Sequence, residues 1–181
     1  MNRLSVEDFR SADKLPLIVV LDNVRSQHNV GAVFRTADAM CIEGVWLCGI
    51  CCCPPNQELH KTALGAEETV SWHYFQDTQD AVRELQAQGY TVYAVEQAHD
   101  SITLEQAAET ITNHQSPITD CPKIAVILGH EVFGVQQEVI DLCTQCIEIP
   151  QYGTKHSMNV SVTAGIVMYR LASSLRRATS K

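Results

Sequence analysis

The chain has 181 residues, which is enough for one domain and too few for a second substrate-binding domain of ordinary size. With 45% hydrophobic and 19% charged residues it has the composition of a globular protein, which excludes a chain that is disordered throughout. The formal net charge of −8 excludes a surface that is basic overall.

Apolar residues recur with strand and helix periods in alternation. The continuous run Leu17–Leu21 is typical of a strand buried on both faces, as in parallel sheets. Asn29 is the expected N-cap of the next helix, and a later helix begins at the possible cap Thr78 and stops before Gly89. In chain order we expect a strand at 17–21, a helix at about 30–41, a strand at 45–48, a short helical stretch after Pro54-Pro55-Asn56, a strand at 70–75, a helix at 78–88, a strand at 91–95, a short helix around 104–108, a strand at 123–129, a helix near 136–143, a strand at 146–149 and a helix at about 158–176.

This alternation predicts one α/β domain, a mostly parallel sheet flanked by helices. Its expected bounds are 17–176, with an N-terminal extension at 1–16 and a C-terminal tail at 177–181. The polar start and the lack of a run of about 18 apolar residues predict a cytoplasmic protein with neither leader nor membrane span. Ligands of such sheets bind outside the carboxyl ends of the strands, so the loops there are the candidate site.

The eight cysteines allow two interpretations. Cys48 with Cys51, and Cys143 with Cys146, have the C-x-x-C spacing of zinc ligands. The two pairs are roughly 90 residues apart, and no turn rich in Gly or basic residues surrounds them. We therefore expect reduced, mostly buried thiols and no metal.

Three loops after predicted strands are dense in Gly, Asn, Ser, Arg and Glu: 22–35, 129–134 and 150–161. Because the carboxyl ends of parallel strands meet at one edge of a sheet, we expect these loops to converge. Neither G-x-G-x-x-G nor G-x-x-x-x-G-K-[ST] occurs, so the pocket is neither a Rossmann dinucleotide site nor a P-loop.

The first loop allows a functional and a structural interpretation. Gly31 would let an anion such as a phosphate approach the free amides of the helix start, with Arg35 further along the helix. Alternatively, Asn29 is only a cap and Arg35 only a surface charge.

Each of the other two loops also allows a functional and a structural interpretation. Glu131 lies between two glycines after a buried strand, and it either serves a ligand or caps the next helix. Ser157 is a good N-cap, which leaves Asn159 and Ser161 unexplained in the first helical turn, since both are modest helix formers.

Three segments occur in a fixed order: Asn29-Val30-Gly31-Ala32-Val33-Phe34-Arg35-Thr36-Ala37, then Leu128-Gly129-His130-Glu131-Val132-Phe133-Gly134, then Ile149-Pro150-Gln151-Tyr152-Gly153 with Ser157-Met158-Asn159-Val160-Ser161-Val162-Thr163-Ala164-Gly165. They resemble the three ordered motifs of the SpoU (TrmH-like) branch of the SPOUT RNA methyltransferases. The likeness spans about 17 to 175. Met158, where the family most often has Leu, is a volume-conserving departure.

The resemblance implies a C-terminal trefoil knot, a homodimer with its active site near the interface, and methyl transfer from S-adenosylmethionine to a ribose 2′-hydroxyl of tRNA or rRNA. It implies that the cofactor lies against the loops after the second and third motif strands. The cofactor-binding residues are then Leu128, Gly129, Glu131, Gly134, Ile149, Pro150, Ser157 and Met158.

The resemblance also assigns Arg35 to the reacting hydroxyl. A guanidinium seldom gives up its proton, so we expect Arg35 to grip the neighbouring phosphate and stabilise the developing alkoxide. His28 is an alternative base. The residues expected to orient Arg35 and the ribose are Asn29, Glu131, Ser157 and Asn159.

The charge distribution fits an RNA partner. The middle of the chain, 74–123, has 2 Lys/Arg and 8 Asp/Glu and so carries −6 of the net −8, while 1–73 carries −3 and 124–181 carries +1. The cations expected to bind RNA are Arg25, Arg35, Lys61, Lys155, Arg170, Arg176 and Arg177. We expect tRNA rather than rRNA, since no separate RNA-binding domain is expected.

We also expect part of the apolar stripe on the last helix to form the dimer interface and part to be core. That stripe consists of Val160, Ala164, Val167, Met168, Leu171 and Leu175.

Two other classes of function remain open at this point. One is a non-catalytic RNA-binding subunit with the same fold, against which the intact motif residues argue. The other is an unrelated α/β enzyme that binds a phosphorylated small molecule at its glycine-containing helix starts.

Overall fold

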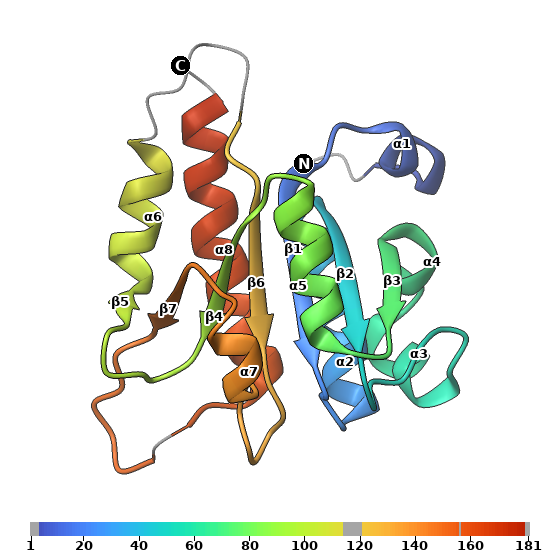
Figure 1. Ribbon diagram of the computed structural model, residues 1–181. Coiled ribbons are helices and arrows are strands. Elements are labelled where there is room, and N and C mark those ends of the chain that lie inside the picture. The colour runs from blue at the N-terminus through green and yellow to red at the C-terminus, as the bar shows by residue number, and fades with distance from the viewer. Residues whose placement is uncertain (1–3, 114–120, 156, 180–181) are drawn as a thin grey trace.

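The computed structural model describes residues 4–113, 121–155 and 157–179. In this part of the chain, seven strands form one sheet in the order β3-β2-β1-β6-β4-β7-β5, and every neighbouring pair is parallel (Figure 1). The strands are β1 (Leu15–Asp22), β2 (Ile42–Cys48), β3 (Ser71–Phe75), β4 (Thr91–Val95), β5 (Ile102–Thr103), β6 (Ile124–Leu128) and β7 (Gln145–Glu148). The helices are α1 (Val6–Ser11), α2 (Gln27–Met40), α3 (Gln57–Ala63), α4 (Ala66–Thr69), α5 (Thr78–Ala87), α6 (Leu104–Thr112), α7 (Gln137–Ile140) and α8 (Val160–Thr179).

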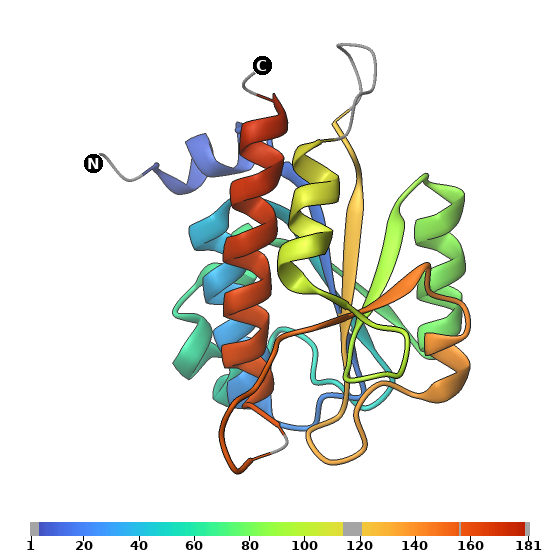
Figure 2. The ribbon, with the colours of Figure 1, turned by 90° about the vertical axis from the view of Figure 1, so that its left-hand side faces the viewer.

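Helices cover both faces of the sheet (Figures 1 and 2). Alternate residues of β1 belong to two separate cores. Leu17 and Val19 pack in the core under α2, α3, α6 and α8, while Ile18 and Val20 pack in the core under α5 and α7. The continuous apolar run is therefore buried on both faces, which confirms the predicted parallel α/β sheet.

Two predicted helix caps are wrong by a small shift. Helix α2 begins at Gln27, because the Ser26 side chain accepts a hydrogen bond from the backbone N–H of Asn29 and caps the helix earlier. Asn29 therefore lies inside the first turn. In the same way Asp77, and not Thr78, caps α5.

Several short elements differ from the expectation. The two-residue strand β5, the four-residue helix α4 and the helix α1 were not predicted, since each is too short to show a period. Helix α7 is only four residues long, and α8 runs from Val160 to Thr179. The turn expected at Pro117 lies outside the described residues.

Helix α8 packs against α2, α6 and β1. All six residues of its predicted apolar stripe are buried in the core of the single chain, so that stripe cannot supply a dimer interface. A second apolar row on the same helix is exposed and consists of Val162, Ile166 and Tyr169. None of the described helices is long and apolar enough to cross a bilayer.

Candidate functional site

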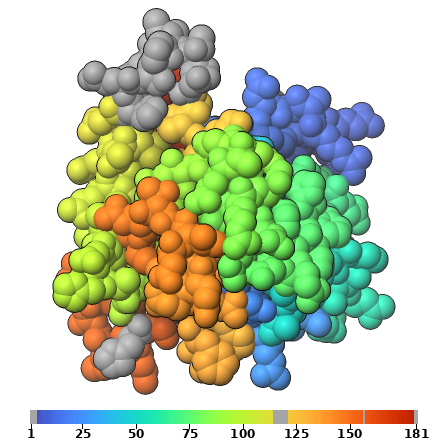
Figure 3. Space-filling model, in the orientation of Figure 1, coloured from blue at the N-terminus to red at the C-terminus, as the bar shows by residue number. Residues whose placement is uncertain are grey.

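The loops that follow β1, β6 and β7 leave the sheet at the same edge, as predicted. In Figure 1 the arrowheads of β1 and β6 point to the lower side of the molecule, and the loops after them meet there. Figure 3 shows the segments after β6 and β7 side by side at that lower surface. Residues from distant parts of the sequence are thereby brought together.

The Glu131 carboxylate joins the second loop to the first. Its Oε2 accepts a hydrogen bond from the backbone N–H of Arg25 at 3.1 Å, and its Oε1 accepts one from that of Ser26 at 3.0 Å. The same Oε1 accepts a bond from Asn29 Nδ2 at 3.1 Å. Glu131 thus binds amides at the start of α2, where the helix dipole also favours a negative charge, and it does not cap the helix that follows it.

The Asn29 amide then joins the first loop to the third. Its Oδ1 accepts a hydrogen bond from Asn159 Nδ2 at 3.2 Å. Asn159 in turn accepts bonds through Oδ1 from the backbone N–H of Ser161 at 2.9 Å and from its hydroxyl at 2.6 Å. Asn159 is therefore the N-cap of α8, a role that we expected for Ser157, and this explains why Asn159 and Ser161 occur together.

The electrostatics of this junction favour an ionised Glu131. Partial burial alone would raise the pKa of its carboxyl group. The hydrogen bonds that it receives from backbone amides, its own and those of Ser26 and Arg25, and from the Asn29 side chain outweigh burial and lower the pKa below its ordinary value. The junction is therefore negatively charged at neutral pH.

Glu131 is presented by a tight turn. His130 and Gly134 exchange two backbone hydrogen bonds of 3.0 and 2.8 Å, and Gly134 has a φ of +70°, which favours glycine. At Gly129 a Cβ would lie 2.1 Å from backbone atoms of Gly134 and Val135, so no side chain fits there. Both glycines of the second motif are thus required by the turn.

A cavity of about 480 Å³ opens beside this junction, within the range of small-molecule sites. Apolar side chains of β6, β7 and Met158 form part of its wall. The residues predicted to bind the cofactor that line it are Leu128, Gly129, Glu131, Gly134, Ile149, Ser157 and Met158. Asn159 lines it as well, whereas Pro150 does not.

Arg35 is not part of this junction. It is exposed on α2, and in the described part of the chain it makes no hydrogen bond or ion pair with Asn29, Glu131, Ser157 or Asn159. It lies six residues after Asn29, or about 9 Å along the helix axis. Within one chain the predicted orienting residues therefore do not touch Arg35.

Gly31 has a different role from the one expected. It is buried, and a Cβ at this position would lie 2.2 Å from the carbonyl oxygen of Leu59 and from the hydroxyl of Thr62. Gly31 therefore permits close packing of α2 on α3, and it does not open the helix start to an anion.

Two groups of residues at this edge were missed. Glu96 and Gln97 follow β4 and line the cavity. Asp22 ends β1 and is fully buried, where it accepts bonds from the Thr78 hydroxyl at 2.5 Å and the Gln136 backbone N–H at 3.1 Å. The signal was present in each case, since an acidic residue directly follows or ends a buried strand.

The cysteines are all free thiols. Burial raises the pKa of Cys48, Cys51 and Cys143 to about 12, so these thiols stay protonated at neutral pH. Cys51 Sγ accepts a hydrogen bond from the Val24 backbone N–H at 3.1 Å, which is a structural contact.

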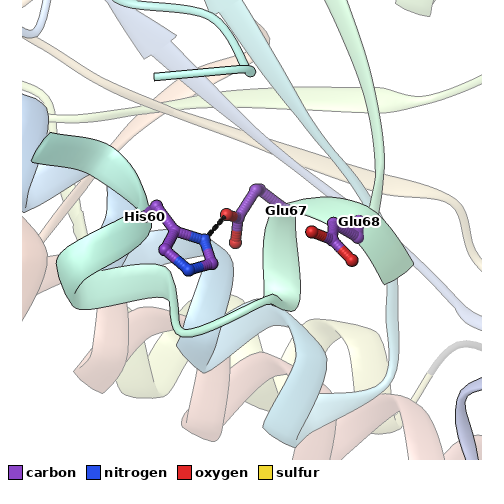
Figure 4. A group of neighbouring side chains, drawn as sticks. All are labelled: His60, Glu67 and Glu68. Atoms are coloured by element: carbon purple, nitrogen blue, oxygen red, sulfur yellow. Dashed lines mark hydrogen bonds and ion pairs between the residues drawn. The ribbon is translucent and has the colours of Figure 1, made fainter. Parts of the chain in front are cut away.

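One group of metal-ligand side chains lies elsewhere, on α3 and α4 (Figure 4). It consists of His60, Glu67 and Glu68, whose ligand atoms all lie within 4.8 Å of one another. His60 Nδ1 and Glu67 Oε1 are 2.5 Å apart, and Glu67 Oε2 accepts a bond from the Gly65 backbone N–H. Both Glu67 oxygens thus already have partners, and none of the three residues lines the cavity.

A model of the SpoU rRNA Methylase family matches residues 16–169. The chain belongs to this family. The matched segment includes the junction of Asn29, Glu131 and Asn159 and all the predicted cofactor-binding residues.

Curated relatives act on two classes of RNA. The chain is 30% identical over 171 residues to a 23S rRNA (guanosine-2′-O-)-methyltransferase, RlmB, of Vibrio parahaemolyticus, covering 93% of this chain and 64% of that protein. It is 28% identical over 167 residues to a tRNA (guanosine(18)-2′-O)-methyltransferase of Thermus thermophilus, covering 92% of this chain and 79% of that protein. The chain thus spans less than two thirds of the ribosomal relative.

Solved structures share the fold. An AdoMet-bound rRNA methyltransferase from Sinorhizobium meliloti aligns with a TM-score of 0.75 at 24% identity, over 91% of this chain and 59% of that one. The A. aeolicus TrmH/SpoU tRNA modifying enzyme aligns with a TM-score of 0.77 at 22% identity, over 97% and 83%. These likenesses establish the architecture of the chain.

Proposed function

We propose that this protein transfers a methyl group from S-adenosylmethionine to a ribose 2′-hydroxyl of RNA. The observation that carries the proposal is the junction of Asn29, Glu131 and Asn159, which joins all three family motifs at the wall of the cavity. An RNA-binding subunit without catalysis would not need this junction beside a cavity of ligand size. Membership of a methylase family agrees with the proposal.

The cavity fits the proposed cofactor. Its volume suits a molecule of that size, and its wall combines apolar side chains, such as Leu128 and Met158, with polar ones, such as Glu96 and Asn159. S-adenosylmethionine would supply a methyl group on a sulfonium, which is already an activated electrophile. The work left to the protein is to position the ribose and handle its proton.

Arg35 is the residue that we assign to the ribose. Its guanidinium stays protonated, so it acts as a hydrogen-bond donor and a positive charge and not as a base. It would hold the phosphate beside the reacting ribose and stabilise the oxygen as negative charge develops there. Its freedom from partners in the described part of the chain leaves its donors available for RNA.

We propose tRNA as the first substrate to test. Support comes from the T. thermophilus tRNA relative, of which the chain covers 79%, against 64% of the V. parahaemolyticus ribosomal relative. Ribosomal RNA is the second candidate, because several relatives of about 30% identity are 23S rRNA methyltransferases.

We also propose that the chain is knotted and dimeric. The knot is supported by family membership and by the return of the chain after β7, which lies beyond β4, to pack α8 on α2 and β1. The dimer is supported by the exposed row of Val162, Ile166 and Tyr169 on α8. A second copy of the chain would cover this row and bring its own side chains close to the edge of the sheet where the three loops meet.

The test is a methyl-transfer assay with labelled S-adenosylmethionine and, separately, total tRNA and ribosomal RNA. We expect label in one RNA class, on a nucleotide that then resists alkaline cleavage, as a 2′-O-methyl nucleotide does. Asn29→Ala should abolish transfer, because it unlinks Glu131 from Asn159. Binding of S-adenosylmethionine without transfer to either RNA class would contradict the proposal.

A further inference from the structure

Strand β4 lies between the two strands whose loops form the cavity. It pairs with β6 on one side and with β7 on the other. The residues after it, Glu96 and Gln97, therefore leave the sheet between the 129–134 turn and the segment after β7, and both line the cavity. Neither belongs to the three motifs, so this fourth loop has no assigned role.

Glu96 is held firmly in place. Its backbone N–H donates to the Ile147 carbonyl oxygen at 3.1 Å, which anchors it to β7. Its side-chain Oε1 accepts a hydrogen bond from the Val135 backbone N–H at 2.8 Å. A Cβ on Gly134 would lie 2.4 Å from the same Oε1, so the turn passes directly over the carboxylate. Glu96 is thus held by β7 through its backbone and by the residue after the 129–134 turn through its side chain.

The second carboxylate oxygen, Oε2, is available to a ligand. In residues 4–113, 121–155 and 157–179 no group donates a hydrogen bond to it. Every fully buried side-chain oxygen or nitrogen among these residues has a partner, so Oε2 of half-buried Glu96 is accessible. The described lining includes no lysine or arginine that would neutralise it. A fixed, unused acceptor on a cavity wall suits a ligand that brings hydroxyl donors.

We propose that Glu96 binds the ribose 2′- and 3′-hydroxyls of the cofactor's adenosine through Oε2. The inference rests on the proposed function, since it takes the ligand to be S-adenosylmethionine. A carboxylate and a ribose hydroxyl form a charge-assisted hydrogen bond, the pairing by which an acidic residue holds the ribose in dinucleotide-binding folds. In this chain the contact comes from the loop after β4, and Oε1 stays with Val135.

The experiment is a calorimetric titration with S-adenosylhomocysteine and its 2′,3′-dideoxy analogue. The wild-type protein should bind the dideoxy analogue about 10-fold to 100-fold more weakly, the loss expected for hydrogen bonds to a charged group. Glu96→Ala should bind both ligands with similar affinity. Glu84→Ala is the matched control, because Glu84 is an exposed residue on α5 whose carboxylate, among the residues that the structure describes, accepts only from Gln88.

Two results would overturn the assignment. The wild type could bind both ligands equally, or Glu96→Ala could keep the wild-type ratio of affinities. A kept ratio with both affinities lowered by the same factor would mean that Glu96 only holds the 129–134 turn. Failure of the wild type to bind S-adenosylmethionine at all would instead refute the proposed function, which keeps the two failures distinct.

Discussion

The side chains assigned to the site have two kinds of role: three of them hold the loops together, and Arg35 makes no contact with these three. Asn29, Glu131 and Asn159 satisfy one another across the three motifs. Arg35 has no such contact in the described part of the chain. Residues that are fully engaged with the protein are suited to building a site, whereas a free guanidinium is suited to binding phosphate. Substitutions should therefore have different consequences in the two groups.

Arg35→Ala should abolish methyl transfer, with a loss of at least about 100-fold, and leave S-adenosylmethionine affinity almost unchanged, since Arg35 does not line the cavity. Arg35→Lys should rescue little, because an ammonium keeps the charge and loses the planar fork that could hold a phosphate and the ribose oxygen together. Single-turnover transfer and cofactor titration measure the two effects separately.

Near-normal turnover of Arg35→Lys would mean that Arg35 is only an electrostatic anchor. The proton acceptor would then be sought at His28 or in bound water. Loss of cofactor binding in a folded Arg35→Ala protein would refute the assignment of Arg35 to the RNA alone.

Glu131→Gln should reduce methyl transfer at least about 10-fold and destabilise the fold by no more than about 1 kcal/mol, since the carboxylate is partly solvated. The pKa of Glu131 is lowered by its hydrogen bonds, so its stabilising effect is present above the unfolded-state pKa and is lost as pH falls through the lower folded-state pKa. Thermal unfolding should therefore separate wild type from Glu131→Gln at pH 7 and bring them together in acid, once the pH is below the lowered pKa of Glu131. A gap that widened in acid would contradict this sign.

Gly129→Ala should weaken cofactor binding by about 10-fold or more and destabilise the protein by about 1–3 kcal/mol. The reason is that the new Cβ would meet backbone atoms of Gly134 and Val135, which cannot move without opening the turn. Gly153→Ala, in the third loop, is the control, because apart from its two chain neighbours no described residue has an atom within 4 Å of its Cβ position. Equal affinities for S-adenosylmethionine in the two variants would show that the turn does not shape the cavity.

At the level of elements, the long ones were predictable and the short ones were not. The run Leu17–Leu21 indicates a central strand, because a strand that is buried on both faces has no position suited to a polar residue. Ile102–Thr103 gives no such signal, since a two-residue strand has no period and owes its place to pairing with β7. The start of α8 was misplaced for a related reason, because Ser157 and Asn159 are both good caps and only tertiary contacts select Asn159.

The site was predictable as a set of loops and not as a set of contacts. Parallel strands bring their carboxyl ends to one edge, which is why the three polar loops could be grouped from the sequence. Strand order decides the rest. The position of β4 between β6 and β7 brings Glu96 into the cavity, and this order is set by long-range pairing that no local pattern reveals.

Helix α8 should mediate dimerisation through its exposed row and not through its buried one. Val162, Ile166 and Tyr169 lie at i, i+4 and i+7, so they form one face, with 54%, 39% and 65% of each residue exposed. Ile166→Asp combined with Tyr169→Asp should weaken self-association at least about 10-fold in sedimentation, because it places charge in an apolar contact.

The matched control for the dimer is Leu64→Asp, which adds the same charge at an apolar residue that is 61% exposed at the end of α3. It should leave association unchanged. A wild-type protein that is monomeric at micromolar concentration and fully active would refute both the interface and a site shared between copies.

For the whole molecule, most of the acidic excess lies in residues 74–123, and part of it reaches the cavity. Glu96 belongs to this segment and lines the cavity. Its charge is useful there, because S-adenosylmethionine carries a net positive charge whereas RNA is a polyanion. The net charge of −8 is thus compatible with a protein that binds a cation in a cavity.

The fold should not depend on a metal. The thiols of Cys48, Cys51 and Cys143 have a pKa raised to about 12 by burial, so they resist the deprotonation that zinc ligation requires. Glu67, in the one other group of ligand-type side chains among the described residues, already has hydrogen-bond partners for both oxygens.

Elemental analysis of the purified protein should find well below one zinc per chain, and excess chelator should leave the unfolding temperature and methyl transfer unchanged. About one zinc per chain with loss of folding on chelation would show a structural metal site. His60→Ala and Cys143→Ala would then be compared, because only the variant that removes a true ligand would lower the zinc content.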